Sequence, residues 1–550
     1  MLWQVKQFAV LIACVFLVSC GGSSGGGTST DGGITPPPPT AICTAGSGAA
    51  ITISGDVTFD RVPHSIGGGL DYSSISVQPV RGVVVEALCN TVIATTTTDA
   101  SGHYSLSVPG GAVDMYIRVK AQMQKTGTPS WDFKVIDNTS NGALYSLYGS
   151  LFNTVASNLI VDLHARSGWG VTSYTSTRSA GPFAILDSVY VAFTKILAEN
   201  PDAVFPALNL NWSVNNNTFS GSTTAGQIGT SYFDGTQNFI LGKANDDSDE
   251  YDDHVVIHEW AHYFESNFSR SDSIGGIHGS DDVLDIRLAF GEGFGNAYSA
   301  MASDDPIYAD AGGNQQANGL VTLNMEANCN DGTSSIGWYS ECSVQSILYD
   351  LYDATNDGSD TLSMGFTPLY NVLVGAQKNT AAMTSIFSFI HALKQNNPGN
   401  VTAINTLLVA QSINNVADEY GSTQTTNPTA SLDALPVYAT GVIGGAAVEV
   451  CSSDEFQVYN GYEGSRFVKF TVASARVLSI VATRTSGTGN RPFLELWKNG
   501  QLIDFAFSSA DATETMVTPT LDVGDYVLEI YDYGNNAVPG VGSTCYNISM

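Results

Sequence analysis

The sequence predicts a multidomain protein in which an α+β domain is flanked by two all-β sandwich domains. Three observations lead to this fold class. The chain has 550 residues, which is too long for a single hydrophobic core. Short runs near both ends alternate between apolar and polar residues, as half-buried strands do. Between them, apolar residues recur at the spacing of helices.

The charge balance excludes one class of partner. The chain carries 52 acidic and 21 basic residues, for a formal net charge of −31. A surface of that sign repels phosphate backbones, so we expect no nucleic-acid binding. Only 13% of the residues are charged, which is more typical of an exported protein than of a cytosolic one.

The N-terminus indicates export. An apolar run from Phe8 to Val18 follows Lys6 and has the length of a signal-peptide core. It ends in Leu17-Val18-Ser19-Cys20-Gly21, which resembles the bacterial lipoprotein box. The resemblance implies a signal peptide over 1–19 and diacylglycerol and palmitate on Cys20. It also implies a lipoprotein of the outer membrane or cell surface, or one that faces the periplasm. An ordinary signal peptide with a free cysteine is the alternative.

Residues 20–48 are rich in Gly, Ser, Thr and Pro and predict a tether between the membrane and the folded part.

Beyond Cys20, six cysteines remain, and none has the spacing of a structural zinc site. Their grouping along the chain suggests three disulfides formed in an oxidising compartment. The expected pairs are Cys43–Cys89, Cys329–Cys342 and Cys451–Cys545.

Residues 49–139 are predicted to form the first β-sandwich. Residues 83–88 read as a buried strand, and residues 103–108 alternate with period two after a turn at Ala100-Ser101-Gly102. The stretch TTTTDASGHYSLSVPGG resembles the carboxypeptidase-regulatory-like, transthyretin-type sandwich. A propeptide that is removed on maturation is a second interpretation of this region.

Residues 446–550 are predicted to form the second β-sandwich, with strands over 466–472, 478–481, 493–497 and 526–531. Their order resembles the pre-peptidase C-terminal domain that follows many secreted proteases.

The central domain, 140–445, is predicted to be rich in helices. The expected helices are Ala184–Leu197, Val255–Phe264, Leu288–Met301, Val344–Tyr352, Met383–Leu393 and Val401–Ala410.

The central domain carries His258-Glu259-Trp260-Ala261-His262. Two histidines four residues apart lie on one face of a helix, about 6 Å apart along its axis, and can bind one Zn²⁺. Glu259 is placed to act as the general base that takes a proton from an attacking water. This is the HExxH signature of zinc metallopeptidases. A chance match on a structural helix is the alternative.

A third ligand is needed, and Glu292 lies thirty residues after His262 between Gly291 and Gly293. The segment AFGEGFGNA resembles the ligand helix of gluzincins, the fungalysin and thermolysin-like peptidases, which implies a zincin-like fold with Glu292 as a zinc ligand. Flanking glycines would let this helix approach the first one closely. Rivals for the third position are His278, Asp281, Asp282 and Asp285.

Two further residues are expected around the ligands. In the resembling families an aspartate follows the ligand glutamate by four residues and contacts a ligand histidine. This chain has Asn296 there, which can still accept a hydrogen bond but carries no charge. His254 shares the face of the two histidines, yet it is eight residues from His262, about 12 Å of helix, so it is a supporting or structural residue.

The acidic run Asp246–Asp253 precedes the expected catalytic helix. It either complements the helix dipole or binds Ca²⁺, because clustered oxygen ligands suit hard cations.

A peptidase also needs a donor for the developing oxyanion. Tyr349, on the helix expected over Val344–Tyr352, is our candidate, although a packing role is the alternative.

The sequence therefore predicts an exported, lipid-anchored zinc metallopeptidase that hydrolyses protein or peptide substrates. His258, His262 and Glu292 would bind zinc, and Glu259 would activate the water. Two alternatives stay open: a non-catalytic surface adhesin with a degenerate peptidase domain, and a metal-dependent hydrolase of other bonds.

Overall fold

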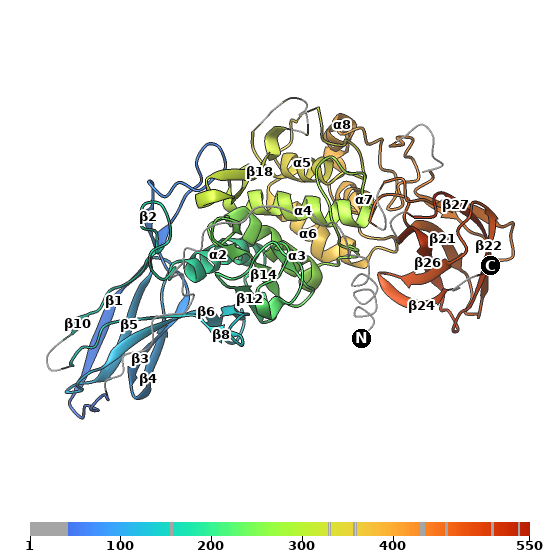
Figure 1. The fold of residues 1–550 in the computed structure, drawn as a ribbon. Coiled ribbons are helices and arrows are strands. Elements are labelled where there is room, and N and C mark those ends of the chain that lie inside the picture. Colours follow the sequence, from blue (N-terminus) through green and yellow to red (C-terminus); the bar gives the residue numbers. More distant parts are fainter. Residues whose placement is uncertain are drawn as a thin grey trace. The chain divides into compact units, whose positions relative to one another are not determined.

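The fold is described from a computed structural model (Figure 1). It describes residues 42–154, 158–327, 329, 332–355, 358, 360–428, 435–456, 460–507, 511–536 and 540–550. The predicted signal peptide, Cys20 and most of the predicted tether lie outside these residues.

The described residues form two compact units. The N-terminal unit contains residues up to Asn267 together with 295–325, and the C-terminal unit contains 268–294 and 326–550. One division falls inside α4 (Ile286–Ser303), so a single continuous helix contributes residues to both units.

The N-terminal unit is built on two large sheets. In β5 (His103–Pro109) the expected alternation is present, since residues 104, 106 and 108 are buried and their neighbours are exposed. β5 pairs antiparallel along β1 (Ala50–Arg61). Three short strands, β2 (Ser76–Pro79), β10 (Leu159–Ile160) and β11 (Leu163–Ala165), complete this five-stranded sheet.

The second sheet has nine strands in the order β13-β14-β12-β7-β6-β3-β4, with β8 and β9 attached to β7 and β6. Strands from both sides of residue 139 share this sheet, so the domain boundary expected there does not coincide with a break between sheets. The division into domains stays a prediction.

The nine strands of this second sheet are β3 (Val83–Cys89), β4 (Thr91–Thr97), β6 (Tyr116–Lys125), β7 (Trp131–Asp137), β8 (Ala143–Leu144), β9 (Ser146–Tyr148), β12 (Leu208–Trp212), β13 (Tyr232–Phe233) and β14 (Asn238–Ile240).

Helix α2 (Gly181–Glu199) packs on this sheet. The ring of Phe193 lies 4.9 Å from that of Trp131 and 5.4 Å from that of Phe133, both on β7. Within the part of the chain that the structure describes, α2 is the one helix long and apolar enough to cross a membrane. However, 61% of its apolar window is buried in the protein, as in the core helix of a globular fold.

Helix α3 (Asp253–Phe268) packs against the part of α4 that belongs to the N-terminal unit. The rings of Trp260 and Phe264 lie 5.9 Å and 6.0 Å from the ring of Tyr298. A four-stranded sheet combines two strands that precede α3 with two strands that follow α4. The first two are β15 (Gly242–Lys243) and β16 (Asp247–Ser248), and the other two are β17 (Ile307–Gly312) and β18 (Asn318–Asn324). Short helical turns are η1 (Thr223–Ala225), η2 (Asn314–Gln316) and η3 (Met325–Ala327).

The C-terminal unit contains a group of helices followed by a β-sandwich. The helices are α5 (Glu341–Tyr352), α6 (Phe366–Val372), η4 (Leu373–Gln377), α7 (Ile386–Asn396), η5 (Pro398–Asn400) and α8 (Val401–Ala410). Helix α7 begins three residues later than expected, because the backbone N–H of Ser385 donates to Oγ of Ser388 and caps the helix there.

The sandwich has a five-stranded sheet in the order β19-β21-β26-β23-β24 and a four-stranded sheet in the order β20-β27-β22-β25. Its core draws apolar side chains from both sheets, among them Val468, Leu494 and Ile548. The strands are β19 (Tyr438–Thr440), β20 (Val448–Ser452), β21 (Arg466–Val472), β22 (Ser479–Ser486), β23 (Pro492–Lys498), β24 (Gln501–Phe507), β25 (Thr513–Val517), β26 (Gly524–Asp532) and β27 (Thr544–Ser549), with η6 (Tyr533–Asn536) between the last two.

All three expected disulfides are formed. Cys43–Cys89 lies in the N-terminal unit, and Cys329–Cys342 lies in the C-terminal unit. Cys451–Cys545 joins residues that face each other on β20 and β27 of the sandwich. The prediction of disulfides is thus confirmed.

Candidate metal centre

Helix α3 carries the three residues of the predicted signature. His258 and Glu259 are buried, with 6% and 8% of their surface exposed, and His262 is half-buried one turn further on. The four-residue spacing puts both imidazoles on the same helix face. Their Nε2 atoms lie 3.0 Å apart, so the two rings converge on a common point.

The orientation of His258 is set by Asn296, one turn beyond Glu292 on α4. Nδ1 of His258 donates to Oδ1 of Asn296 at 2.8 Å. With the proton on Nδ1, the lone pair on Nε2 of His258 points toward His262, where a metal would need it. Asn296 is 5% exposed, so the hydrogen bond is protected from water.

The close approach of α4 to α3 depends on Gly295. A Cβ atom at this position would lie 2.7 Å from Cε1 and 2.8 Å from Nδ1 of His258, well inside contact distance. Gly293, by contrast, lies against α5: a Cβ there would be 2.5 Å from Cβ of Val344. The residue that lets α4 approach the face of α3 that carries His258 is therefore Gly295, whereas Gly293 allows contact with α5.

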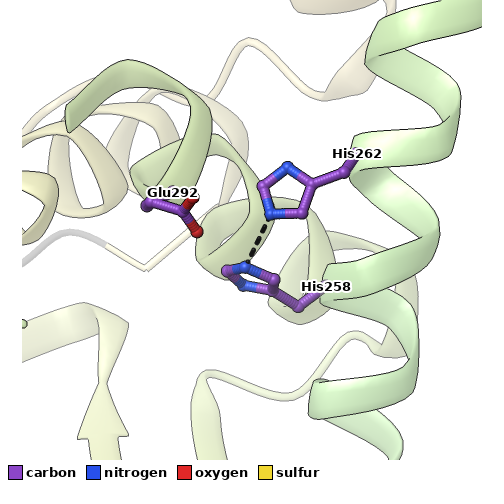
Figure 2. Close-up of side chains that lie close together, drawn as sticks. All are labelled: His258, His262 and Glu292. Carbon is purple, nitrogen blue, oxygen red and sulfur yellow. Dashed lines mark hydrogen bonds between the residues drawn. The ribbon is translucent and has the colours of Figure 1, made fainter. Parts of the chain in front are cut away.

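Glu292 lies on the same face of α4 as Asn296, because four residues are close to one helical turn. Figure 2 shows its carboxylate directed toward the two imidazoles of α3. One ligand atom from each of His258, His262 and Glu292 can be chosen so that all lie within 4.8 Å of one another. Glu292 is also buried, with 7% of its surface exposed.

The donor set fits Zn²⁺. Two imidazole nitrogens and one carboxylate are the His₂Glu set of catalytic zinc sites, which leave a fourth position for water or substrate. Two nitrogens bound tetrahedrally to one ion at about 2.1 Å would be about 3.4 Å apart, close to the 3.0 Å between the two Nε2 atoms.

His278 approaches the glutamate from a loop of the C-terminal unit. Its Nε2 lies 3.3 Å from Oε2 of Glu292, and its Nδ1 lies 2.6 Å from Oε2 of Glu341 at the start of α5. His278, one of the rival ligands in the sequence, thus lies between the carboxylates of Glu292 and Glu341. The contribution of Glu341 was missed, because nothing in its local sequence connects it with a residue 63 positions earlier.

Asp285, a second rival, belongs to a buried ionic group. It accepts two hydrogen bonds of 2.9 Å from the guanidinium of Arg287, which also contacts Glu529 on β26. Because both oxygens of Asp285 bind the guanidinium of Arg287, this side chain has a structural role. No metal-binding group that includes Asp281 or Asp282 is found among the described residues.

His254 and Tyr349 have other surroundings. Nε2 of His254 donates to the backbone carbonyl of Asp305 at 3.1 Å, and burial lowers the pKa of this histidine. It thus anchors the turn after α4. Tyr349 is buried on α5, with its ring 5.9 Å from that of Tyr352. Its role as the oxyanion donor stays a prediction.

Comparison with known proteins gives one family. Residues 205–409 match the family described as Mycolysin C-terminal domain. The matched region includes α3, α4 and all three candidate ligands. The curated proteins give no match.

Several solved structures are similar over about a fifth of the chain. The pre-peptidase C-terminal domain of a collagenase from Bacillus anthracis is 18% identical, with 20% of this chain and 92% of that chain covered and a TM-score of 0.15. The surface-associated copper-binding protein CorA from Methylomicrobium album BG8 is 9% identical, with 20% and 97% covered and a TM-score of 0.16. PliG, a periplasmic lysozyme inhibitor from Aeromonas hydrophila, is 15% identical, with 20% and 96% covered and a TM-score of 0.14.

The family match over residues 205–409 indicates that the chain contains a peptidase-associated module, and the candidate metal centre lies within the matched residues.

Proposed function

We propose that the protein is an exported zinc-dependent metallopeptidase that hydrolyses protein or peptide substrates. The observation that carries this proposal is the convergence of His258, His262 and Glu292 on one point. The match of residues 205–409 to a peptidase family supports it, because the candidate ligands lie inside the matched region.

Each residue has a distinct task in the proposed reaction. Zn²⁺ held by the three ligands would supply a Lewis acid that polarises a peptide carbonyl and makes water easier to deprotonate. Glu259, next to His258, takes the proton from the attacking water and can pass it to the leaving amine. Asn296 holds His258 in the tautomer that leaves Nε2 free. His278, supported by Glu341, orients the carboxylate of Glu292.

The test compares two forms of the protein that begin after Cys20. The wild type should hydrolyse an unstructured protein substrate and contain one Zn²⁺ per chain. Glu259→Gln keeps the shape of the base but cannot accept the proton, so it should lose activity by at least about 100-fold while still holding zinc. Equal activity in both forms would exclude Glu259 as the base. Absence of zinc and of activity in both would favour the adhesin alternative.

The location of the protein is a second part of the proposal. Three disulfides are consistent with an oxidising, extracytoplasmic compartment. We propose that Cys20 bears the lipid that anchors the chain to the outer membrane or cell surface. Wild type expressed in a bacterium should incorporate labelled palmitate and enter the detergent phase, and Cys20→Ala should do neither. Labelling of the variant would place the lipid elsewhere.

A further inference from the structure

A second group of possible metal ligands lies in the N-terminal unit, before α3. Asp247 on β16, Asp249 just after it, and Asp310 on β17 each offer a carboxylate oxygen, and these atoms lie within 4.8 Å of one another. The strands bring them together, because β16 and β17 pair antiparallel with Asp247 opposite Gly312. Two of the three residues belong to the acidic run noted in the sequence, and the third comes from 61 residues beyond Asp249.

These carboxylates have buried oxygens that lack hydrogen-bond donors. Oδ1 of Asp247, of Asp249 and of Asp310 is each buried and accepts no hydrogen bond from any residue that the structure describes. Asp249 is only 3% exposed. Its other oxygen accepts from the hydroxyl of Ser231, whose own oxygen accepts from the backbone N–H of Leu241 at 3.0 Å. One oxygen of Asp249 is therefore fixed, while the other receives no hydrogen bond from any described residue outside the three carboxylates.

The described part of the chain places no basic side chain in an ion pair with this group. Among the described residues, none of these three aspartates forms an ion pair with a lysine, arginine or histidine. A neighbouring acid, Asp252, is already satisfied by His64 at 2.8 Å and by the backbone N–H of Ala311 at 2.9 Å. Burial, together with repulsion from the other carboxylates, raises the pKa of Asp247 to about 6 and that of Asp310 to about 8. Three converging carboxylates of this kind need a cation or bound protons.

We propose that Asp247, Asp249 and Asp310 form a Ca²⁺ site that is separate from the zinc centre. Carboxylate oxygens without nitrogen or sulfur ligands suit a hard cation. Calcium fits better than magnesium, because it accepts six to eight oxygens in irregular geometry, whereas magnesium requires a near-octahedral set and keeps its water. The half-buried Asp247 and Asp310 leave room for water to complete the coordination. Binding would hold β16, β17 and the segment that leads into α3 together.

The test uses the wild-type chain beginning after Cys20, freed of divalent cations and then titrated with CaCl₂ alone. It should bind one Ca²⁺ per chain in equilibrium dialysis, and its thermal unfolding midpoint should rise with Ca²⁺ concentration. A tenfold excess of MgCl₂ should not displace the calcium. Failure of the wild type to bind Ca²⁺ at millimolar concentration would overturn the proposal, and equal binding of Mg²⁺ would overturn the choice of calcium.

Two variants locate the site. Asp310→Asn should lower calcium affinity by about 10-fold or more, because it removes one ligand charge. In cation-free buffer it should unfold at no lower temperature than wild type, since one repelling charge is gone. The matched control is Asp246→Asn, whose carboxylate accepts from the hydroxyl of Thr218 and supplies no oxygen to the group. Its calcium affinity should fall much less than that of Asp310→Asn. Equal affinity of Asp310→Asn and wild type would also overturn the assignment.

A third variant separates this proposal from the proposed function. His262→Ala removes a candidate zinc ligand and should bind Ca²⁺ as tightly as wild type. Loss of calcium binding in His262→Ala would mean that the calcium had occupied the zinc centre, which contradicts a separate site.

Discussion

Nδ1 of His258 donates a hydrogen bond of 2.8 Å to Oδ1 of Asn296, and both side chains are buried. The neutral amide fixes the ring without adding charge next to the proposed metal. A carboxylate at this position would make the histidine a more basic ligand. In the proposed zinc centre, the asparagine would thus set how strongly His258 holds the metal.

We therefore predict that Asn296→Ala weakens zinc binding by about 10-fold to 100-fold, because His258 loses its orienting partner. Asn296→Asp should bind zinc more tightly than wild type. Competition with a chromogenic chelator measures both affinities. The control is His254→Gln, since His254 contacts the carbonyl of Asp305 and not a ligand; its zinc affinity should match that of wild type. If Asn296→Ala also matched it, the hydrogen bond would have no role in binding.

Two glycines of α4 are predicted to respond differently to the same substitution. Alanine usually stabilises a helix relative to glycine by about 1 kcal/mol. In Gly295→Ala the new methyl group would push on the His258 ring, so zinc affinity and peptidase activity should both fall. In Gly293→Ala the methyl group meets Val344 and the carbonyl of Glu341.

Overpacking at residue 293 should cost about 1–3 kcal/mol of stability and leave His258 and His262 in place. Zinc affinity measured beside the thermal unfolding midpoint distinguishes the two effects. A Gly295→Ala protein with wild-type zinc affinity would show that α4 can move away from α3 without consequence.

The sequence predicted those features that depend on neighbouring residues. Helices expected over Ala184–Leu197 and Leu288–Met301 correspond to α2 and α4, because apolar residues at helical spacing mark the buried face directly. Helix α5 begins three residues before the expected Val344, since Oγ of Ser340 accepts from the N–H of Ser343 at the helix start. The convergence of His258 and His262 could be predicted equally well, because it follows from their spacing on one helix.

Features that depend on distant pairing could not be predicted in this way. Asp310 joins Asp247 and Asp249 only because β17 pairs with β16, and a strand pairing leaves no local pattern at either residue. The contact of Arg287 with Glu529 connects residues 242 positions apart. Glu292 was found through a resemblance to known ligand helices, not from periodicity, which marks the core face alone.

The buried ionic group of Asp285, Arg287 and Glu529 should make the C-terminal unit sensitive to the loss of one of its partners. The side chains of Arg287 and Glu529 are at most 2% exposed, and the guanidinium makes hydrogen bonds of 2.9 Å and 2.8 Å to the carboxylate of Glu529. Glu529→Gln leaves Arg287 paired with Asp285 but replaces two charge-assisted hydrogen bonds with weaker contacts to a neutral amide. It should therefore lower the free energy of unfolding by about 1–3 kcal/mol.

Asp525→Asn is the matched control on the same strand, β26. Its carboxylate is exposed and accepts from the hydroxyl of Thr471, so the change should stay within about 0.5 kcal/mol. Urea unfolding of the two variants beside wild type gives the comparison. Similar effects of both substitutions would contradict the special weight of the buried pair.

The buried Lys394 on α7 should make stability depend on pH. Its Nζ donates to Oδ1 of Asn415 at 3.1 Å and to the carbonyl of Val416 at 3.2 Å, with no carboxylate among these acceptors. Burial lowers the pKa of this lysine to about 8, from 10.5 in an exposed lysine. Between these two values the unfolded chain binds a proton that the folded chain has released, so stability rises with pH.

The effect is bounded and can be isolated. Below pH 8 the cost of burying the charge is present in full, and it is relieved as pH rises from 8 toward 10.5, by at most about 1.4 kcal/mol per pH unit. Lys394→Met has no such group, so wild type should gain stability relative to it between pH 8 and pH 10 in urea unfolding. Lys378→Met, which alters an exposed lysine, controls for general effects of alkaline pH. If wild type and Lys394→Met kept a constant stability difference across this range, the lysine would be charged at no cost in the folded chain.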